Sequence, residues 1–150
     1  MKKVVRYNQK ELSLEEFNKN NMSHIDDLFF LIKSKKNNIS NLMPPSKEQH
    51  KNFCFNHPYR FWFLVYEKES LLGSIYVTYE NAIGINFLDI QNECNAAIVN
   101  HVLENIDSMP AKPSLVQSDF YCNVAPENKD LIELLKKLGA VISQVSYKFK

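Results

Sequence analysis

The sequence predicts an α/β protein with a mixed β-sheet of about six strands and about four helices on its two faces. A run of β-branched and aromatic residues, "YRFWFLVYEKESLLGSIYVTYENAIGINFLDI", is interrupted only by short polar turns, which is typical of consecutive antiparallel strands. The segments after it alternate between helical spacing and strand composition, which favours strand–helix–strand crossovers with helices packed on the sheet. With 150 residues, the chain is expected to form one domain over residues 1–150.

Composition and charge narrow the classes of function. The formal net charge is +1, with 18 basic and 17 acidic residues along the chain, so we expect neither a nucleic-acid groove nor a membrane surface. No apolar run approaches the roughly 18 residues of a membrane-spanning helix, and "MKKVVRYNQKEL" lacks the apolar stretch of a signal peptide. Three cysteines without metal-ligand spacing favour a reduced, cytoplasmic setting and no metal site.

The first 55 residues are expected to contain one short strand and two helices. "VVRY", residues 4–7, has strand composition, whereas "LSLEEFNKNN" has no clear pattern. Ser23 is expected to cap the helix "SHIDDLFFLIKSKK", which has acids in its first turn and lysines at its end. Ser46 and Gln49 have the spacing of a capping box for a second helix that ends at about Phe55.

The rest of the chain is expected to alternate strands and helices. Three antiparallel strands separated by "EKES" and "EN" come first, and one further strand follows each of the last two helices. The final helix ends at "LGA", where Gly139 is the expected C-terminal stop. The expected strands cover residues 60–66, 72–79, 83–88, 114–124 and 140–149, and the helices cover residues 95–106 and 125–139.

Three stretches in this order resemble the GNAT family of N-acetyltransferases. "LLGSIYV" is similar to the family's third strand, in which a glycine follows an apolar pair. "AIGINFLDIQNECNAAIVNHVLENI" is similar to its fourth strand, pyrophosphate loop and following helix. "FYCNVAPENKDLIELLKKLGA" is similar to its fifth strand and fourth helix, where the family has an Asn near the helix start, here Asn128, and a Leu-Gly-Phe at its end. The resemblance covers the chain from about Ser23 onward and implies a GNAT-like fold.

The resemblance implies that acetyl-CoA, or another acyl-CoA, is the co-substrate. In such proteins the fourth and fifth strands separate, the fourth strand binds the pantetheine arm, and the pyrophosphate lies on the N–H groups that open the next helix. A helix N-terminus suits an anion because its first N–H groups lack partners and carry the positive end of the helix dipole. The residues that the resemblance places at the co-substrate are Ile85, Phe87, Leu88, Gln91, Asn92, Cys94, Asn95, Ala96, Ala97, Asn123 and Asn128.

The loop "QNECNA" departs from the family pattern at one position. The family has Gln or Arg, two residues, Gly, one residue, and then Gly or Ala. Gln91 and Ala96 match this pattern, while Cys94 replaces the first glycine. A glycine there allows a positive φ and close approach of a phosphate, and Glu93 adds a negative charge beside the expected anion, although Asn92 can cap a helix. The segment is therefore either a modified pyrophosphate loop or a strand–helix turn without a ligand.

The usual catalytic positions of the family also differ. Ala82 stands where many members have a glutamate base, and Leu135 stands where many have a tyrosine that protonates the leaving thiolate. The expected catalytic groups are polar residues near the point where the two strands separate, although each could instead be a packing, turn or edge residue. These candidates are Glu80, Asn86, Tyr76 and Tyr121.

Aromatic and polar residues in "HPYRFW" lie where the family frames its acceptor pocket. Such rings could stack on a sugar or a nucleotide, and the same residues could simply begin a strand after the turn at Pro58. The candidate substrate-binding residues are His57, Tyr59 and Trp62.

The resemblance implies an acyl-CoA-dependent N-acyltransferase in which a primary amine attacks the thioester directly. We expect a small-molecule acceptor such as an amino sugar, free or nucleotide-linked, and a monomer or homodimer. The departures at Ala82, Cys94 and Leu135 keep a second hypothesis open: a catalytically degenerate GNAT-fold domain that binds acyl-CoA or a partner protein without turnover. A third hypothesis is an interaction domain in which "SQVSYKF" pairs as an edge strand with a partner chain.

Overall fold

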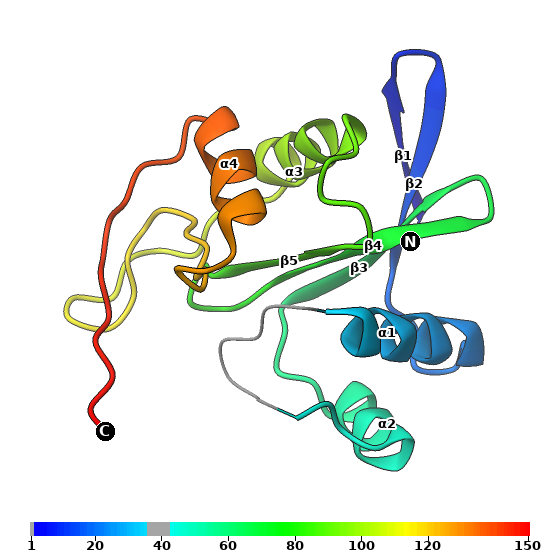
Figure 1. Ribbon diagram of the computed structural model, residues 1–150, viewed down its shortest axis with the longest axis horizontal. Helices are drawn as coiled ribbons and strands as arrows, with labels where there is room; N and C mark the ends of the chain where they lie inside the picture. The colour runs from blue at the N-terminus through cyan, green and yellow to red at the C-terminus, as the bar shows by residue number, and fades with distance from the viewer. Residues whose placement is uncertain (1, 36–42) are drawn as a thin grey trace.

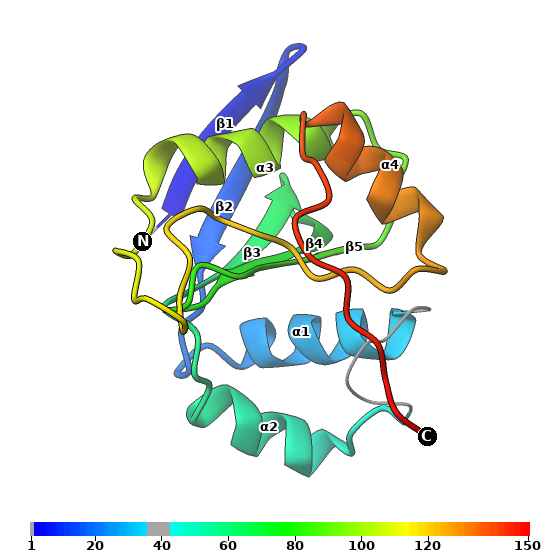
Figure 2. The same ribbon diagram turned by 90° about the vertical axis from the view of Figure 1, so that its left-hand side faces the viewer.

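A computed structural model describes residues 2–35 and 43–150, in which five strands form a sheet in the order β1-β2-β3-β4-β5, with antiparallel neighbours. Figures 1 and 2 show α1 and α2 on one face of this sheet and α3 and α4 on the other, which confirms the predicted fold class. The elements are β1 (Lys2–Tyr7), β2 (Lys10–Glu16), α1 (Met22–Ser34), α2 (Lys47–Phe55), β3 (Phe61–Glu67), β4 (Ser70–Val77), β5 (Ile83–Phe87), α3 (Cys94–Asn105) and α4 (Lys129–Lys137).

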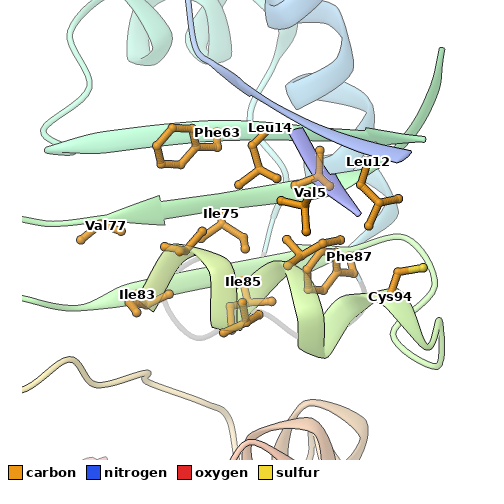
Figure 3. Packing of buried hydrophobic residues seen from close by; sticks show 14 of the residues in the cluster. Val5, Leu12, Leu14, Phe63, Ile75, Val77, Ile83, Ile85, Phe87 and Cys94 are labelled. Atoms are coloured by element: carbon orange, nitrogen blue, oxygen red, sulfur yellow. The ribbon is translucent and has the colours of Figure 1, made fainter. Parts of the chain in front are cut away.

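The buried side chains form two cores, one on each face of the sheet. In β3, Phe63 and Val65 belong to the core with α3, whereas Trp62, Leu64 and Tyr66 belong to the core with α1. This division follows from the alternation of side chains along a strand. Figure 3 shows the core under α3, to which every strand contributes. Because both faces of the sheet are covered, β3 consists of an unbroken apolar run, "FWFLVY".

The N-terminal hairpin contains a strand that the sequence pattern did not reveal. β1 and β2 are joined at Asn8 and Gln9, which have positive φ angles of 45° and 65°. Two consecutive residues with positive φ form the tight turn that suits the twist of a hairpin. Leu12 and Leu14 of β2 are 0% and 1% exposed, so this strand is a central part of the core.

The helix ends follow the predicted capping chemistry with one exception. The capping box of Ser46 and Gln49 is confirmed at the start of α2, and Gly139 has the φ of +84° expected of a C-terminal stop. α1 begins earlier than predicted, because the Asn21 side chain accepts from Ser23 N at 3.0 Å and caps the helix in place of Ser23. The first turn of α1 consequently holds no acidic residue. No helix among the described residues is long and apolar enough to cross a membrane.

The prediction of a strand over residues 114–124 was wrong. Lys112 and Val116 form an antiparallel bridge that closes a tight turn, and Ser114 in that turn has a φ of +66°. The Gln117 carbonyl then accepts from the Asn81 side chain at 2.8 Å instead of joining a ladder. The Asn81 side chain therefore satisfies a backbone carbonyl that a neighbouring strand would otherwise bond. Within residues 114–124, Tyr121 alone forms a bridge with the sheet, a parallel one with Ala82.

The prediction of a final strand over residues 140–149 was also wrong. Figure 1 shows this segment, in red, leaving α4 as an irregular trace. Val145, Tyr147 and Phe149 alternate as in a strand, yet they are 67%, 88% and 96% exposed. An alternating pattern specifies which side chains share a face but does not supply the hydrogen-bonding neighbour that a strand needs.

Candidate active site

β5 meets the segment after α3 at one point, the parallel bridge between Ala82 and Tyr121. Ile83 N donates to Tyr121 O at 2.7 Å, and Tyr121 N donates to Asn81 O at 3.1 Å. In the part of the chain that the structure describes, residues 122–125 form no further bridge with β5. The pairing therefore stops at Tyr121, where the resemblance implies that two strands separate.

The outer edge of β5 beyond this bridge offers backbone groups to a ligand. On the inner edge, Leu88 N donates to Leu72 O at 2.9 Å, so its N–H faces β4. Strand N–H groups alternate between the two edges, and Ile83 N points outward to its bridge, so Ile85 and Phe87 also present their N–H groups outward. An extended chain with amide groups could pair with this edge as an added strand would.

The loop between β5 and α3 is held by its own side chains. Asp89 Oδ1 accepts from Gln91 N at 3.0 Å, and Asn92 Oδ1 accepts from Cys94 N at 2.9 Å. Asn95 Nδ2 reaches back to Asp89 O at 2.9 Å, and Asn95 N donates to Asn92 O at 3.1 Å. Two N–H groups of the first turn of α3 are thus already hydrogen-bonded, so an anion at this helix end must compete with Asn92.

Cys94 is a core residue. It is 0% exposed and packs in the same cluster as Leu12 and Phe87 (Figure 3). Its φ is not positive, so the loop does not require the conformation that favours glycine. Burial raises the pKa of the Cys94 thiol, which keeps it protonated and unreactive.

The charges around the loop are unfavourable for a pyrophosphate. Asp89 and Glu93 belong to the loop, and Asp130 lies in the first turn of the neighbouring α4. Asp130 Oδ1 accepts from Gln91 Nε2 at 3.2 Å, which engages the glutamine that the family pattern assigns to the phosphate. Asn95 Oδ1 is buried without a hydrogen-bond partner among the described residues, and it is an acceptor rather than a donor. Each of these groups raises the free energy of a dianion placed nearby.

On the α1 face of β5, small and polar residues face the first helix. Asn86 Nδ2 donates to Leu31 O of α1 at 3.3 Å. Gly84 pairs with Tyr76 of β4, and a Cβ atom at Gly84 would overlap the Tyr76 ring. The ring therefore lies directly over the glycine, which is one reason for a glycine inside a strand.

Tyr76 is stacked on Tyr59, the residue two positions before β3. The ring centroids are 3.9 Å apart and the planes differ by 6°. Burial raises the pKa of both hydroxyls.

Cys122, the residue after the bridge, packs against the core on the α3 side of the sheet, whereas Tyr76 and Tyr59 pack on the α1 side. Burial raises the pKa of the Cys122 thiol to about 11.

The other predicted catalytic and co-substrate residues are spread more widely. Glu80 is exposed in the turn between β4 and β5, and Tyr121 is half-buried. Asn123 is exposed, and Asn128 is the N-cap of α4, with Oδ1 accepting from Leu131 N at 3.3 Å. The remaining predicted co-substrate residues lie half-buried in the first turn of α3: Ala96 and Ala97.

The three candidate substrate-binding residues belong to one aromatic cluster. His57 and Trp62 have ring centroids 5.1 Å apart, and His57 Nδ1 accepts from Tyr59 N at 3.2 Å. Trp62 is only 5% exposed, so it forms the buried side of the cluster. Burial lowers the pKa of His57, which keeps its ring neutral near pH 7. A cavity of about 190 Å³ adjoins the cluster and is lined by Phe17, Lys19, Cys54, Phe55 and His57.

The fold is that of the GNAT acetyltransferases. RimL, the ribosomal L7/L12 alpha-N-protein acetyltransferase in complex with coenzyme A, is similar with a TM-score of 0.59 and 12% identity, over 91% of this chain and 82% of that one. An aminoglycoside acetyltransferase from an uncultured soil metagenomic sample, in complex with trehalose, has a TM-score of 0.58 and 11% identity, with 93% and 95% covered. A possible acetyltransferase from Clostridium difficile 630 has a TM-score of 0.54 and 9% identity, with 93% and 97% covered. No family model and no curated protein matches the sequence.

Sequence analysis did not single out Gly84, which leaves room for the Tyr76 ring. Gly84 carried a usable signal, because a glycine inside a β-branched run often marks close approach of another group. Among residues 2–35 and 43–150, no group of three or more His, Cys, Asp or Glu residues could hold a metal ion.

Proposed function

We propose that this protein is an acyl-CoA-dependent N-acyltransferase that transfers acetyl to a primary amine. The observation that carries the proposal is the outer edge of β5, where Ile85 and Phe87 present backbone groups in a strand that leads directly to the N-terminus of α3. The amide groups of a pantetheine arm fit such an edge. The GNAT fold, and coenzyme A in the complex of one structural neighbour, support this assignment.

The proposed reaction is direct transfer. A neutral amine attacks the thioester carbonyl, and the protein contributes positioning, a route for protons and stabilisation of developing charge. The amine approaches from the α1 face, where Asn86, Tyr76 and Tyr121 supply polar groups. We propose that Glu80, an exposed carboxylate in the turn between β4 and β5, accepts a proton from the incoming ammonium.

We propose a small acceptor with an amino group, such as an amino sugar. His57 lines a cavity of about 190 Å³, and the Tyr59 ring lies next to His57, with ring centroids 5.6 Å apart. Aromatic rings of this kind stack well on sugar faces. One structural neighbour is an aminoglycoside acetyltransferase, which supports an amino-sugar acceptor. Another acts on a protein, so a peptide with a free N-terminus belongs in the same assay.

Two measurements test the proposal. Calorimetric titration with acetyl-CoA should give saturable binding, and free thiol should appear when amino sugars are added. Acetyl-pantetheine, which has the arm without the pyrophosphate, should also serve as a donor if β5 supplies most of the binding. Absence of heat at millimolar acetyl-CoA, together with no thiol release from any amine, would overturn the proposal.

A second candidate function is binding without turnover. The observations that favour it are the occupied N–H groups of Cys94 and Asn95 and the carboxylates around the loop. Binding of acetyl-CoA with no thiol release above background from any amine would establish this candidate instead.

We further propose a reducing, cytoplasmic setting and a monomer or homodimer. Cys54, Cys94 and Cys122 are all free thiols, which supports the first point. Light scattering on the native protein at several concentrations distinguishes a monomer from a dimer.

A further inference from the structure

The cavity beside the aromatic cluster has three aromatic side chains in its walls, Phe17, Phe55 and His57. The rings of Phe17 and His57 have centroids 5.5 Å apart and planes that differ by 79°, so they meet edge to face. Phe55, the last residue of α2, is 42% exposed. A planar ring that enters the cavity can therefore stack on one wall and meet the edge of another.

The charge at this cavity is positive. Lys19, in the loop before α1, is a lining residue, and no carboxylate from residues 2–35 or 43–150 lines the cavity. An ammonium group placed there would be repelled by Lys19 without a carboxylate to offset the repulsion, whereas a phosphate would be attracted. The cavity therefore suits the part of an acceptor that is remote from its amine and carries negative charge.

The volume of the cavity fits one fragment of a ligand. About 190 Å³ is the space that roughly six water molecules occupy in the liquid, whereas pockets for complete small ligands begin at about 300 Å³. A single planar group with its substituents is of this size, so the rest of the acceptor must lie outside the cavity.

The distance from the cavity to β5 sets the length of the acceptor. Under the proposed function, the nucleotide end of acetyl-CoA lies at the α3 end of β5, so the thioester lies further along the strand, near Gly84. Gly84 pairs with Tyr76, and Tyr76 pairs with Trp62. Phe17, in the cavity wall, donates from its N to Trp62 O at 2.7 Å. Neighbouring strands are about 4.8 Å apart, so Phe17 lies roughly 14 Å from Gly84, which is further than one sugar ring extends.

We infer, on the basis of the proposed function, that the acceptor is an amino sugar linked to a nucleoside diphosphate and that this cavity binds its nucleotide part. The base lies between the aromatic walls, Lys19 pairs with the diphosphate, and the sugar extends over Tyr59 and Tyr76 towards β5. Every nucleobase has a face that stacks on an aromatic ring, so the walls select a nucleotide without selecting one base. A free amino sugar reaches β5 but leaves the cavity empty.

The fluorescence of Trp62 reports directly on the cavity. Trp62 is the one tryptophan in the sequence, and its ring centroid lies 5.1 Å from those of Phe17 and His57. Nucleoside diphosphates with uracil, thymine, cytosine, adenine or guanine are titrated into the protein with saturating CoA present, so that the donor site is already filled. We expect a saturable change in fluorescence with at least one of them, and no change with any of them would overturn the inference.

Two pairs of variants locate the binding. Lys19→Met should weaken the diphosphate about fivefold at low salt and leave the affinity for the parent nucleoside unchanged, while Lys68→Met, at an exposed lysine beyond the far end of β3, should change neither. Phe55→Ala should weaken the diphosphate and the nucleoside alike, by roughly tenfold, and Phe30→Ala, at a phenylalanine of α1 that is 55% exposed, should weaken neither. Equal effects within either pair would place the nucleotide elsewhere and overturn the inference.

Turnover distinguishes a failure of this subsite from a failure of the proposed function. Amino sugars linked to the nucleotide that binds should release thiol from acetyl-CoA at lower concentrations than the free amino sugars do. If no amine is acetylated but a nucleoside diphosphate binds in a manner that depends on Lys19 and Phe55, the proposed function fails and the nucleotide subsite is supported. If free amino sugars are acetylated and no nucleoside diphosphate binds, the proposed function is supported and the nucleotide subsite is overturned.

Discussion

Replacing Asn81 with alanine should destabilise the protein strongly. Asn81 is 0% exposed, and its side chain joins the β4–β5 turn to the segment after α3 through three hydrogen bonds. Asn81 Nδ2 donates to Met109 O at 2.9 Å and to Gln117 O at 2.8 Å, while Oδ1 accepts from Met109 N at 2.6 Å. Asn81 also has a φ of +70°, which asparagine tolerates better than alanine does.

The magnitude follows from these contacts. Three buried hydrogen bonds at about 1 kcal/mol each, with about 1 kcal/mol for alanine at positive φ, give a loss of about 4 kcal/mol in the free energy of unfolding for Asn81→Ala. Asn81→Gly loses the same bonds but tolerates the φ angle, so it separates the two contributions.

Urea denaturation followed by circular dichroism measures both variants. With a slope of about 2 kcal/mol per molar urea, the midpoint of Asn81→Ala should fall by about 2 M. A loss below about 1 kcal/mol for Asn81→Ala would refute the reasoning, because it would mean that one net hydrogen bond at most is at stake. A wild-type midpoint for Asn81→Gly would show that backbone strain alone decides the effect.

Four further predictions concern the loop, the thiols and the chain end. Glu93→Gln should bind acetyl-CoA a few-fold more tightly at low salt, whereas Glu104→Gln at the far end of α3 should not; calorimetry at two ionic strengths measures this. Cys94→Gly should lose about 2 kcal/mol of unfolding free energy without a gain in acetyl-CoA affinity, and tighter binding would mean that the loop does need a glycine. Burial raises the pKa of Cys54 from 9.0 to about 11, so the protonated thiol contributes to the free energy of unfolding in full below pH 9.0. This contribution should be lost as the pH rises to about 11, and urea midpoints measured across that pH range test it. Phe149→Ser, at a residue that is 96% exposed, should leave the thermal midpoint unchanged and reduce any self-association seen by light scattering.

The predicted fold was most accurate where local signals are strong. The run that forms β3, β4 and β5 has unambiguous composition, and the spacing of Ser46 and Gln49 is sufficient to start α2. β2 was missed because its hairpin turns at Asn8 and Gln9 rather than at an Asn-Gly pair, the strongest local sign of a hairpin. The wrong strands had the right composition, but a strand also depends on a distant partner.

Prediction of the site had the same limit. The sequence located the β5 strand and the loop after it, because both lie within one continuous stretch. It could not show that Cys94 packs in the core, since the direction of that side chain depends on how α3 meets the sheet. It also could not pair Tyr59 with Tyr76, which are 17 positions apart and meet only because Gly84 leaves room for a ring.

The hydrogen bond from Asn86 to the Leu31 carbonyl connects the two proposed binding sites. Asn86 belongs to the strand whose edge is proposed to hold the donor, and Leu31 belongs to the helix that borders the acceptor side. If an amine that shifts α1 also shifts β5 through this contact, thermodynamic reciprocity requires each substrate to change the affinity of the other by the same factor.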